Sequence, residues 1–113
     1  MTDCIFCKVI AGELPGKFAY QDDELVVIHD INPKAPVHLL LIPREHVATV
    51  SDLQDSHQNV GGKLLLVARD VAKKLGVTNG YRLVVNNGAD SGQIVPHLHM
   101  HLLGGWKKRQ KDF

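Results

Sequence analysis

The pattern of apolar and polar residues along the chain predicts a sheet with two helices. Short runs that are apolar throughout, or that alternate with polar residues, are typical of strands when turn residues bound them. Such runs occur at 18–21, 24–30, 37–42, 81–85 and 96–105. Two further segments, 4–10 and 54–75, have apolar residues at helical spacing. The chain is therefore predicted to form an α+β domain with about five mostly antiparallel strands, one long helix and one short helix.

The long helix, predicted over 54–75, carries an apolar stripe that should face the core. Ser51 or Asp52 is expected to cap its first turn, and Gly76 is expected to end it. The stripe consists of Leu64, Val67, Ala68, Val71 and Leu75. We interpret this helix as core packing rather than as a carrier of chemistry.

The short helix, predicted over 4–10, brings two cysteines to one side. Asp3 is expected to cap this helix, and the helix should end near Gly12. Cys4 and Cys7 are three residues apart, so their side chains share a face. Two cysteines at this spacing suit a metal site or a reduced thiol pair better than a disulfide scaffold.

Three histidines alternate with apolar residues near the end of the chain. Successive side chains of a strand point to opposite faces, so His97, His99 and His101 are predicted to share one face. The apolar residues between them occupy the other face and can bury in the core. Neighbouring imidazoles add little stability, because each needs a hydrogen-bond partner and charged ones repel one another. The row therefore predicts a metal site or a catalytic site, and His38 in the central strand is a fourth candidate.

Length and composition indicate a single globular domain. The chain has 113 residues, so the domain is predicted to span 1–113, with a short basic tail from about residue 106. The net charge is +1, which does not favour nucleic acid as a partner. No apolar run approaches the ~20 residues that span a bilayer, and the start of the chain does not read as a signal peptide. We therefore expect a cytoplasmic protein with no membrane partner.

The histidine stretch and three other segments resemble a known family. His97-Leu98-His99-Met100-His101-Leu102-Leu103 is similar to the histidine-triad pattern, in which histidines alternate with apolar residues. Further matches are Ile5-Phe6 with 13–15, 29–33 with 35–38, and 80–82 with Asn86 and Gly92-Gln93. The chain is most similar to the Hint branch of the histidine-triad nucleotide hydrolases, and the similarity covers nearly all of residues 3 to 105.

The resemblance implies an enzyme. Hydrolases of this branch act on nucleoside 5'-phosphoramidates of the AMP–amine type through a nucleotidyl-histidine intermediate. His99 matches the family's nucleophile, with its Nδ1–H held by a backbone carbonyl. His101 matches the histidine that donates to phosphate oxygens, and His38 matches a further histidine of the hydrogen-bond relay. His97, the first triad histidine, completes the catalytic set, and no cofactor is implied for the reaction.

The resemblance also implies a purine-nucleotide site. Asp30 matches the carboxylate that accepts hydrogen bonds from the ribose hydroxyls. The residues that match contacts to phosphate or the leaving group are Asn86, Gly92 and Gln93. The residues that match the apolar slot for the base are Ile5, Phe6, Val9, Ile28, His29 and Ile31. Plain core packing is the alternative for each apolar residue of this slot.

The sequence departs from the family pattern close to the triad. Ile94 stands where some members carry a serine near the phosphate, and Pro96 replaces a frequent tyrosine. The tail after Gly105 is short and has a sequence of its own. These departures bear on the preference for a leaving group more than on the chemistry.

A structural zinc ion and a homodimer are further implications of the resemblance. Some family members bind zinc through two cysteines and two histidines that match Cys4, Cys7, His46 and His97. The alternative is a pair of reduced thiols beside two ordinary histidines. The implied homodimer pairs two sheets edge to edge.

Two other functions stay open at this point. One is a non-catalytic module on the same fold that binds purine nucleotides or acts as a scaffold; the presence of His99 argues against it. The other is a metal-dependent hydrolase that uses the three histidines as ligands, and activity that survives chelation would exclude it.

Overall fold

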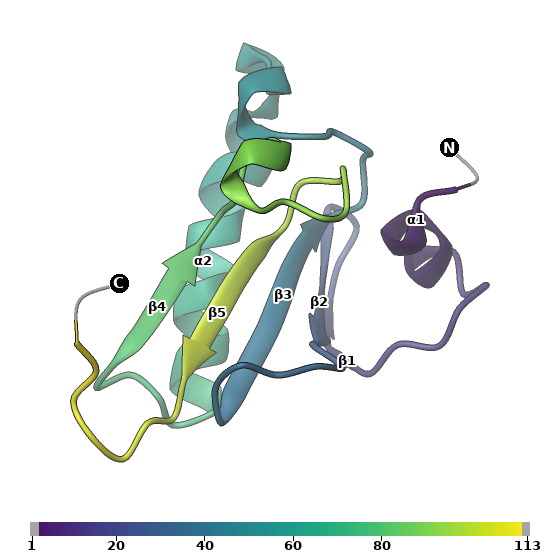
Figure 1. Cartoon of the computed structure of the whole chain (residues 1–113). Coiled ribbons are helices and arrows are strands. Elements are labelled where there is room, and N and C mark those ends of the chain that lie inside the picture. Colours follow the sequence, from purple (N-terminus) through teal and green to yellow (C-terminus); the bar gives the residue numbers. More distant parts are fainter. Residues whose placement is uncertain (1–2, 112–113) are drawn as a thin grey trace.

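The computed structural model describes residues 3–111 and contains one sheet and two helices (Figure 1). Residues 1–2 and 112–113, the two ends of the predicted domain, lie outside the described residues. In chain order the elements are α1 (Ile5–Ile10), β1 (Phe18–Gln21), β2 (Leu25–His29), β3 (Val37–Pro43), α2 (Gln58–Lys74), β4 (Tyr81–Val84) and β5 (Met100–Gly104). Three short 3₁₀ turns occupy Val50–Asp52, Asp55–His57 and Ala89–Ser91.

The five strands pair in the order β1-β2-β3-β5-β4, and every pairing is antiparallel. β3 lies at the centre between β2 and β5, and it is buried along almost its whole length, as its apolar sequence predicted. β1 and β4 form the two edges (Figure 1). The predicted fold class is therefore confirmed.

The two helices pack against opposite faces of the sheet. Along β3, Leu39 and Leu41 join an apolar core beneath α2, whereas Leu40 and Ile42 join a second core with Phe6 of α1. This division follows from the alternation of side chains along a strand. The face that does not carry α2 is therefore only partly covered, and it is the face toward which His38 and His101 point.

The long helix buries the predicted stripe, with one exception. The buried members are Leu64, Val67, Ala68 and Val71. Leu75 is the C-cap rather than a helical residue, and its side chain is 37% exposed. No helix in the described part of the chain has the length and apolar character needed to cross a bilayer.

The histidine stretch forms a strand only from Met100 onward, which is later than predicted. Within β5 the predicted alternation holds, because Met100 and Leu102 are buried under α2 while His101 pairs with Leu40 on the other face. Before Met100 the chain leaves the ladder, since Pro43 of β3 has no N–H to donate. The N–H of Leu98 bonds instead to the carbonyl oxygen of Val47, at 2.6 Å, in the loop beyond β3.

The predicted cap of α1 is wrong. Cys4, not Asp3, is the N-cap residue, and its Sγ accepts the backbone N–H of Cys7 at 3.3 Å. A thiol at this position replaces the usual carboxylate or hydroxyl. The helix ends at Ile10, and Gly12 follows in the left-handed conformation with φ of 82°.

The predicted start of α2 is also wrong. The helix begins four residues later than expected, with His57 as its N-cap. Neither Ser51 nor Asp52 caps it, because Asp52 forms a capping box with Thr49 around a separate 3₁₀ turn. Local side-chain hydrogen bonds at this turn compete with an earlier helix start.

The carboxylate of Asp22 holds the turn between β1 and β2. Its Oδ1 accepts the N–H of Glu24 (2.8 Å) and of Leu25 (2.9 Å), and its Oδ2 accepts the hydroxyl of Tyr20 (2.7 Å). Lys63 of α2 places its Nζ 3.0 Å from the same Oδ2. Burial alone would raise the pKa of Asp22, but these hydrogen bonds outweigh it and hold the pKa well below its usual range.

The substitution Asp22→Asn is expected to lower the free energy of unfolding near neutral pH by about 1–2 kcal/mol, because it removes charge-assisted hydrogen bonds. The pKa of Asp22 is depressed in the folded state. Its contribution is therefore present above the unfolded pKa of about 4 and is lost as the pH falls through the folded pKa. Urea unfolding should show that the wild type and Asp22→Asn differ less in their free energy of unfolding near pH 3 than near neutral pH.

The matched control is Asp23→Asn, because the side chain of Asp23 is 92% exposed. This variant should change the free energy of unfolding by less than about 0.5 kcal/mol. If both variants lose the same free energy of unfolding near neutral pH, the carboxylate of Asp22 stabilises the fold no more than the exposed carboxylate of Asp23 does.

Candidate active site

His38, His99 and His101 converge on the sheet face opposite α2. His101 lies on β5 beside Leu40, and His38 lies at the start of β3. His38 Nε2 and His101 Nδ1 are 2.9 Å apart, and the ring centroids of His99 and His101 are 5.0 Å apart. The structure therefore brings together three of the four histidines predicted to be catalytic.

Backbone and ring hydrogen bonds determine the tautomers of His38 and His101. The N–H of Lys34 donates to His38 Nδ1 at 3.0 Å, so the proton of a neutral His38 resides on Nε2. That Nε2–H donates to His101 Nδ1, and a neutral His101 therefore carries its own proton on Nε2. The arrangement makes the Nε2–H of His101 a donor to a bound ligand.

A backbone carbonyl holds the ring of His99, as the family resemblance implied. His99 Nδ1 donates to the carbonyl oxygen of His97 at 2.8 Å, which leaves the lone pair of a neutral ring on Nε2. The residue is only 7% exposed and packs edge-on against Phe6, with ring centroids 4.9 Å apart. A neutral imidazole held in this way is a competent nucleophile.

Burial favours the neutral forms of His38 and His101. It is the largest cause that lowers the pKa of each, and in His101, where His99 and His38 add to the effect, the pKa falls to about 4. Asp30 acts in the opposite direction on both rings. Because these pKa values lie below the unfolded value of about 6.5, the two rings reduce stability as the pH falls below that value. At neutral pH His101 is therefore a hydrogen-bond partner rather than a cation.

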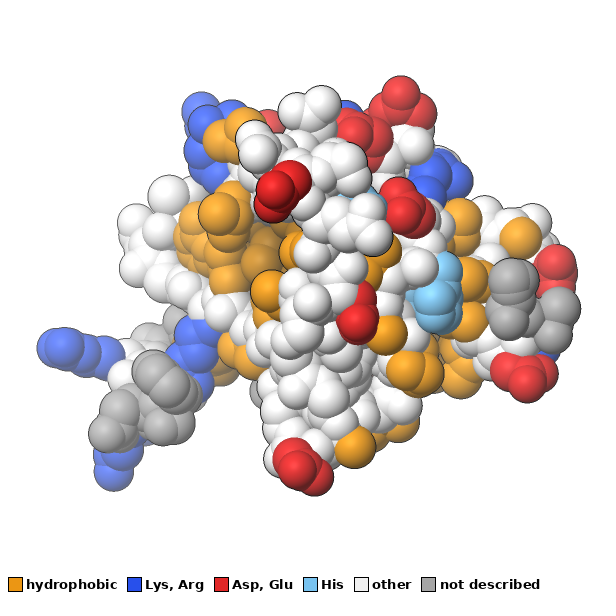
Figure 2. All heavy atoms as spheres, turned by 90° about the horizontal axis from the view of Figure 1, so that it is seen from above, with side chains coloured by type: hydrophobic (Ala, Val, Ile, Leu, Met, Phe, Trp, Pro, Cys, Tyr) orange, Lys and Arg blue, Asp and Glu red, His pale blue; other side chains and the backbone are white. Residues whose placement is uncertain are grey.

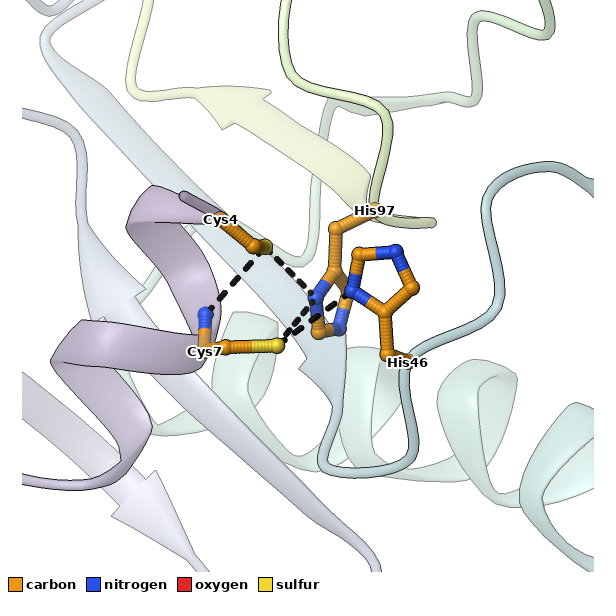
Figure 3. A group of neighbouring side chains, drawn as sticks. All are labelled: Cys4, Cys7, His46 and His97. Carbon is orange, nitrogen blue, oxygen red and sulfur yellow. Dashed lines mark hydrogen bonds between the residues drawn. The ribbon is translucent and has the colours of Figure 1, made fainter. Parts of the chain in front are cut away.

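A second cluster joins α1 to the histidine segment (Figure 3). Cys4 Sγ lies 3.3 Å and Cys7 Sγ lies 3.6 Å from His97 Nδ1. Cys7 Sγ also lies 3.3 Å from His46 Nδ1. One atom from each residue lies within 4.8 Å of the other three. The four residues predicted to bind zinc are thus brought together, although they come from three separate segments of the sequence.

The hydrogen bonding of His97 suits a metal ligand. Its Nε2 donates to the carbonyl oxygen of Pro43 at 2.8 Å, so the lone pair of Nδ1 faces the two sulfur atoms. The residue is 0% exposed, and burial is the main cause that lowers its pKa, which favours the neutral ring that a metal requires. Two thiolates with two neutral imidazoles form the donor set of a closed tetrahedral zinc site. The residues present therefore fit a zinc ion.

Asp30, His38 and His101 also have ligand atoms within 4.8 Å of one another. The tautomer of His38 argues against a metal at this second group. Binding through Nε2 would move the ring proton to Nδ1, where the N–H of Lys34 already points, so that two donors would face each other. We therefore interpret this group as a hydrogen-bond chain.

Three of the six residues predicted to form the base slot come together. Phe6, Val9 and Ile28 belong to one buried apolar cluster, and Phe6 carries this cluster up to the ring of His99. Gly16 lies close by, since a Cβ built on it would stand 2.7 Å from a methyl carbon of Val9. A larger residue at Gly16 would therefore displace part of this cluster.

The other three predicted slot residues lie apart from this cluster. Ile5 is 52% exposed and Ile31 is 90% exposed. His29 follows Ile28 in β2, so its side chain points to the opposite face of the sheet. The contact of these residues with a base stays a prediction.

The polar residues predicted near the phosphate lie in or beside the loop between β4 and β5. Gln93 accepts the N–H of Gly88 at 2.7 Å and donates to the carbonyl oxygens of Ala48 (2.8 Å) and Val95 (3.0 Å). Its amide therefore holds the loop in place. Gly92 ends the 3₁₀ turn of this loop with φ of 97°, and the half-buried Asn86 lies at the start of the loop.

Sequence reasoning missed the backbone groups that hold the imidazoles of His38 and His97. The N–H of Lys34 and the carbonyl oxygen of Pro43 each determine a ring's tautomer. Lys34 precedes β3 and Pro43 is its last residue. Neither carries a side-chain signal, since every residue has a carbonyl and all but proline have an N–H.

Comparisons with known proteins agree with this geometry. Residues 11–108 match the family model described as the HIT domain. The chain is 44% identical over 104 residues to Protein HitA of Neisseria gonorrhoeae, which covers 92% of this chain and 97% of that protein. The matched range of the family model includes all four candidate catalytic histidines and begins after Phe6 and both cysteines.

Two solved structures extend the comparison. A HIT family hydrolase from Clostridium thermocellum has a TM-score of 0.94 at 44% identity, over 100% of this chain and 99% of that chain. A histidine triad nucleotide-binding protein from Candida albicans has a TM-score of 0.81 at 32% identity, over 98% of this chain and 87% of that chain.

Proposed function

The chain belongs to the HIT domain family, and we propose that it is a nucleotide hydrolase that acts on nucleoside 5'-phosphoramidates of the AMP–amine type. The observation that carries the proposal is the 2.8 Å hydrogen bond from His99 Nδ1 to the carbonyl of His97, which leaves Nε2 ready to attack. The neighbouring His101 supports it, because its Nε2–H is placed as a donor. The similar structures described as a HIT family hydrolase and as a nucleotide-binding protein agree with this activity.

In the proposed reaction, His99 Nε2 attacks the α-phosphorus, the bond between phosphorus and the amine nitrogen breaks, and that nitrogen takes a proton from solvent as the amine leaves. The nucleotide is then held as a nucleotidyl-histidine, which water hydrolyses to release a nucleoside monophosphate. His101 donates its Nε2–H to the phosphate oxygens as negative charge builds up on them. His38 orients His101 through the 2.9 Å contact between the two rings.

The rest of the nucleotide is proposed to lie along the α1 side of the triad. Phe6, Val9 and Ile28 supply an apolar surface for a purine base next to the nucleophile. Asp30 is proposed to accept the ribose hydroxyls. The loop residues proposed to face the phosphate or the leaving group are Asn86, Gly92 and Gln93.

The substitution His99→Ala is expected to reduce hydrolysis of an adenosine 5'-phosphoramidate by at least about a thousandfold, because it removes the nucleophile. The wild type should hydrolyse the substrate equally well with and without a chelator. Denaturation in alkaline detergent during turnover of a labelled substrate should trap nucleotide on the wild type and none on His99→Ala, because the bond between phosphorus and the imidazole nitrogen survives in alkali but not in acid.

The matched control is His57→Gln, a histidine that lies outside the proposed site and pairs with Glu45 at 3.0 Å. It should retain wild-type turnover. A wild type that binds AMP but never hydrolyses a phosphoramidate would contradict the proposal and favour a non-catalytic nucleotide-binding module.

The cluster of Cys4, Cys7, His46 and His97 is proposed to hold a structural zinc ion. The support is the tautomer of His97, whose Nδ1 lone pair faces both sulfur atoms. A bound zinc ion would tie α1 to the histidine segment and so add to the stability of the fold. It has no step in the proposed reaction.

Protein purified without a chelator is expected to contain about one zinc ion per chain by elemental analysis. The substitution Cys7→Ser should remove the zinc and lower the melting temperature, because it takes one of four ligands from the site. Asp30→Asn should keep the zinc, since Asp30 belongs to the other cluster. Zinc that remains in Cys7→Ser but is lost from Asp30→Asn would place the metal at the group of Asp30, His38 and His101 and so contradict the proposed zinc site.

We also propose a homodimer in which two sheets pair along β4, an edge strand. Figure 2 shows hydrophobic side chains gathered on the left of the molecule, the side on which Figure 1 places β4 and α2. Leu65 and Leu66 of α2 are 58% and 53% exposed, and Leu83 of β4 is 36% exposed. Apolar side chains on a helix and an adjacent sheet edge are typical of an interface between copies.

Sedimentation equilibrium is expected to give a mass near twice the 12.5 kDa of one chain. The double substitution Leu65→Glu with Leu66→Glu should shift the mass toward one chain, because it buries charges at the proposed interface. Leu14→Glu is the control, since Leu14 is 38% exposed and lies elsewhere. A wild type that sediments as a single chain at all concentrations would rule out the dimer.

A further inference from the structure

The carboxylate of Asp30 lies beside the contact between His38 and His101. Asp30 directly follows β2, and its N–H donates to the carbonyl oxygen of His38 at 3.0 Å, which aligns the two residues. Its Oδ1 accepts the N–H of Asn32 at 2.8 Å, so one oxygen is held by the turn. Its Oδ2 lies 3.5 Å from His38 Nε2. The second oxygen is therefore aimed at the imidazole chain.

One N–H of His38 thus faces two acceptors. The N–H of Lys34 occupies Nδ1, so His38 has a single proton to donate, on Nε2. His101 Nδ1 lies 2.9 Å from this nitrogen and Asp30 Oδ2 lies 3.5 Å from it. The side chain of His38 is 1% exposed, so water does not readily supply a substitute partner. Asp30 Oδ2 is therefore a second acceptor beside the proton that orients His101.

Asp30 is also the one acidic residue among the titratable groups that act on His101. The titratable groups that act on His101 are His99 of the same segment, His38 of β3, Lys34 of the loop before β3, and Asp30. Of these four, only Asp30 raises the pKa of His101. Its side chain is 17% exposed, so its charge is only partly screened by solvent. Geometry and charge thus connect Asp30 to the same ring.

We propose that Asp30 is a positioning residue for His101, in addition to its proposed contact with the ribose. The inference rests on the proposed function and deepens it. Ribose hydroxyls that donate to Asp30 Oδ2 remove the competing acceptor and leave the His38 proton to His101. His101 is then fixed with its Nε2–H toward the phosphate. Recognition of the sugar is therefore coupled to the orientation of His101, the residue that donates a hydrogen bond to the phosphate.

This coupling distinguishes a positioning role from simple binding. If Asp30 only held the sugar, removal of the ribose hydroxyls would raise KM and leave kcat unchanged. If Asp30 acts through His38, their removal also lowers kcat, because His101 is less well oriented in the bound complex.

The first test follows His101 directly and needs no turnover. The imidazole nitrogens of the wild type are observed by NMR, with the His101 signals assigned by their loss in His101→Gln. Saturating AMP is expected to shift the His101 Nδ1 signal toward the hydrogen-bonded form, and saturating 2',3'-dideoxy-AMP is expected to shift it less. In Asp30→Asn the two nucleotides should have the same effect. Asp23→Asn, whose side chain is 92% exposed, should behave as the wild type.

The second test measures kcat and KM for adenosine and 2',3'-dideoxyadenosine 5'-phosphoramidates. The wild type is expected to lose about tenfold in kcat, as well as binding, when the hydroxyls are absent. In Asp30→Asn, kcat should be nearly equal for the two substrates, because the carboxylate that competes for the His38 proton is absent from both complexes. A difference confined to KM, or identical His101 signals with both bound nucleotides, would overturn the positioning role alone. Failure of the wild type to bind either nucleotide would overturn the proposed function, and this inference with it.

Discussion

The pairing of β3 with β5 at the centre of the sheet is the constraint on which the rest of the structure depends. In this register Leu39 and Leu41 face the core under α2, while His38 and His101 face the other way. A slip of one residue would turn the imidazoles into the apolar core and expose the leucines. The burial that stabilises the sheet therefore also determines the direction in which the histidines point.

His97 joins the two side-chain clusters into one unit. Its ring faces the sulfur atoms of Cys4 and Cys7 through Nδ1 and the Pro43 carbonyl through Nε2, while its own carbonyl holds His99. Every polar atom of the ring thus has a partner, which a fully buried imidazole requires. The same helix that supplies the cysteines also packs Phe6 against His99, with ring centroids 4.9 Å apart. The position of α1 and the environment of His99 are accordingly linked.

The sequence predicted which side chains lie on each face of the sheet, but it did not predict the hydrogen bonds that determine the tautomers of His38 and His97. Alternation is a property of side chains, so it correctly placed Met100 and Leu102 opposite His101. The proton of His38 is determined by the backbone N–H of Lys34, which no residue pattern marks. The approach of an acidic side chain to this ring likewise depends on how a loop closes after β2, and a pattern of residue types carries no such distance.

β5 is the last strand among residues 3–111, yet it lies inside the sheet, between β3 and β4. β3 ends at Pro43 and β5 begins at Met100, so a chain that is still being synthesised has made β3 well before its partner β5 leaves the ribosome. Until then, the apolar residues of β3 lack one neighbour and stay exposed to other chains. A premature stop or a proteolytic cut before Met100 therefore removes an interior strand rather than a dispensable end, so quality control would meet an unfolded polypeptide and not a weakened enzyme.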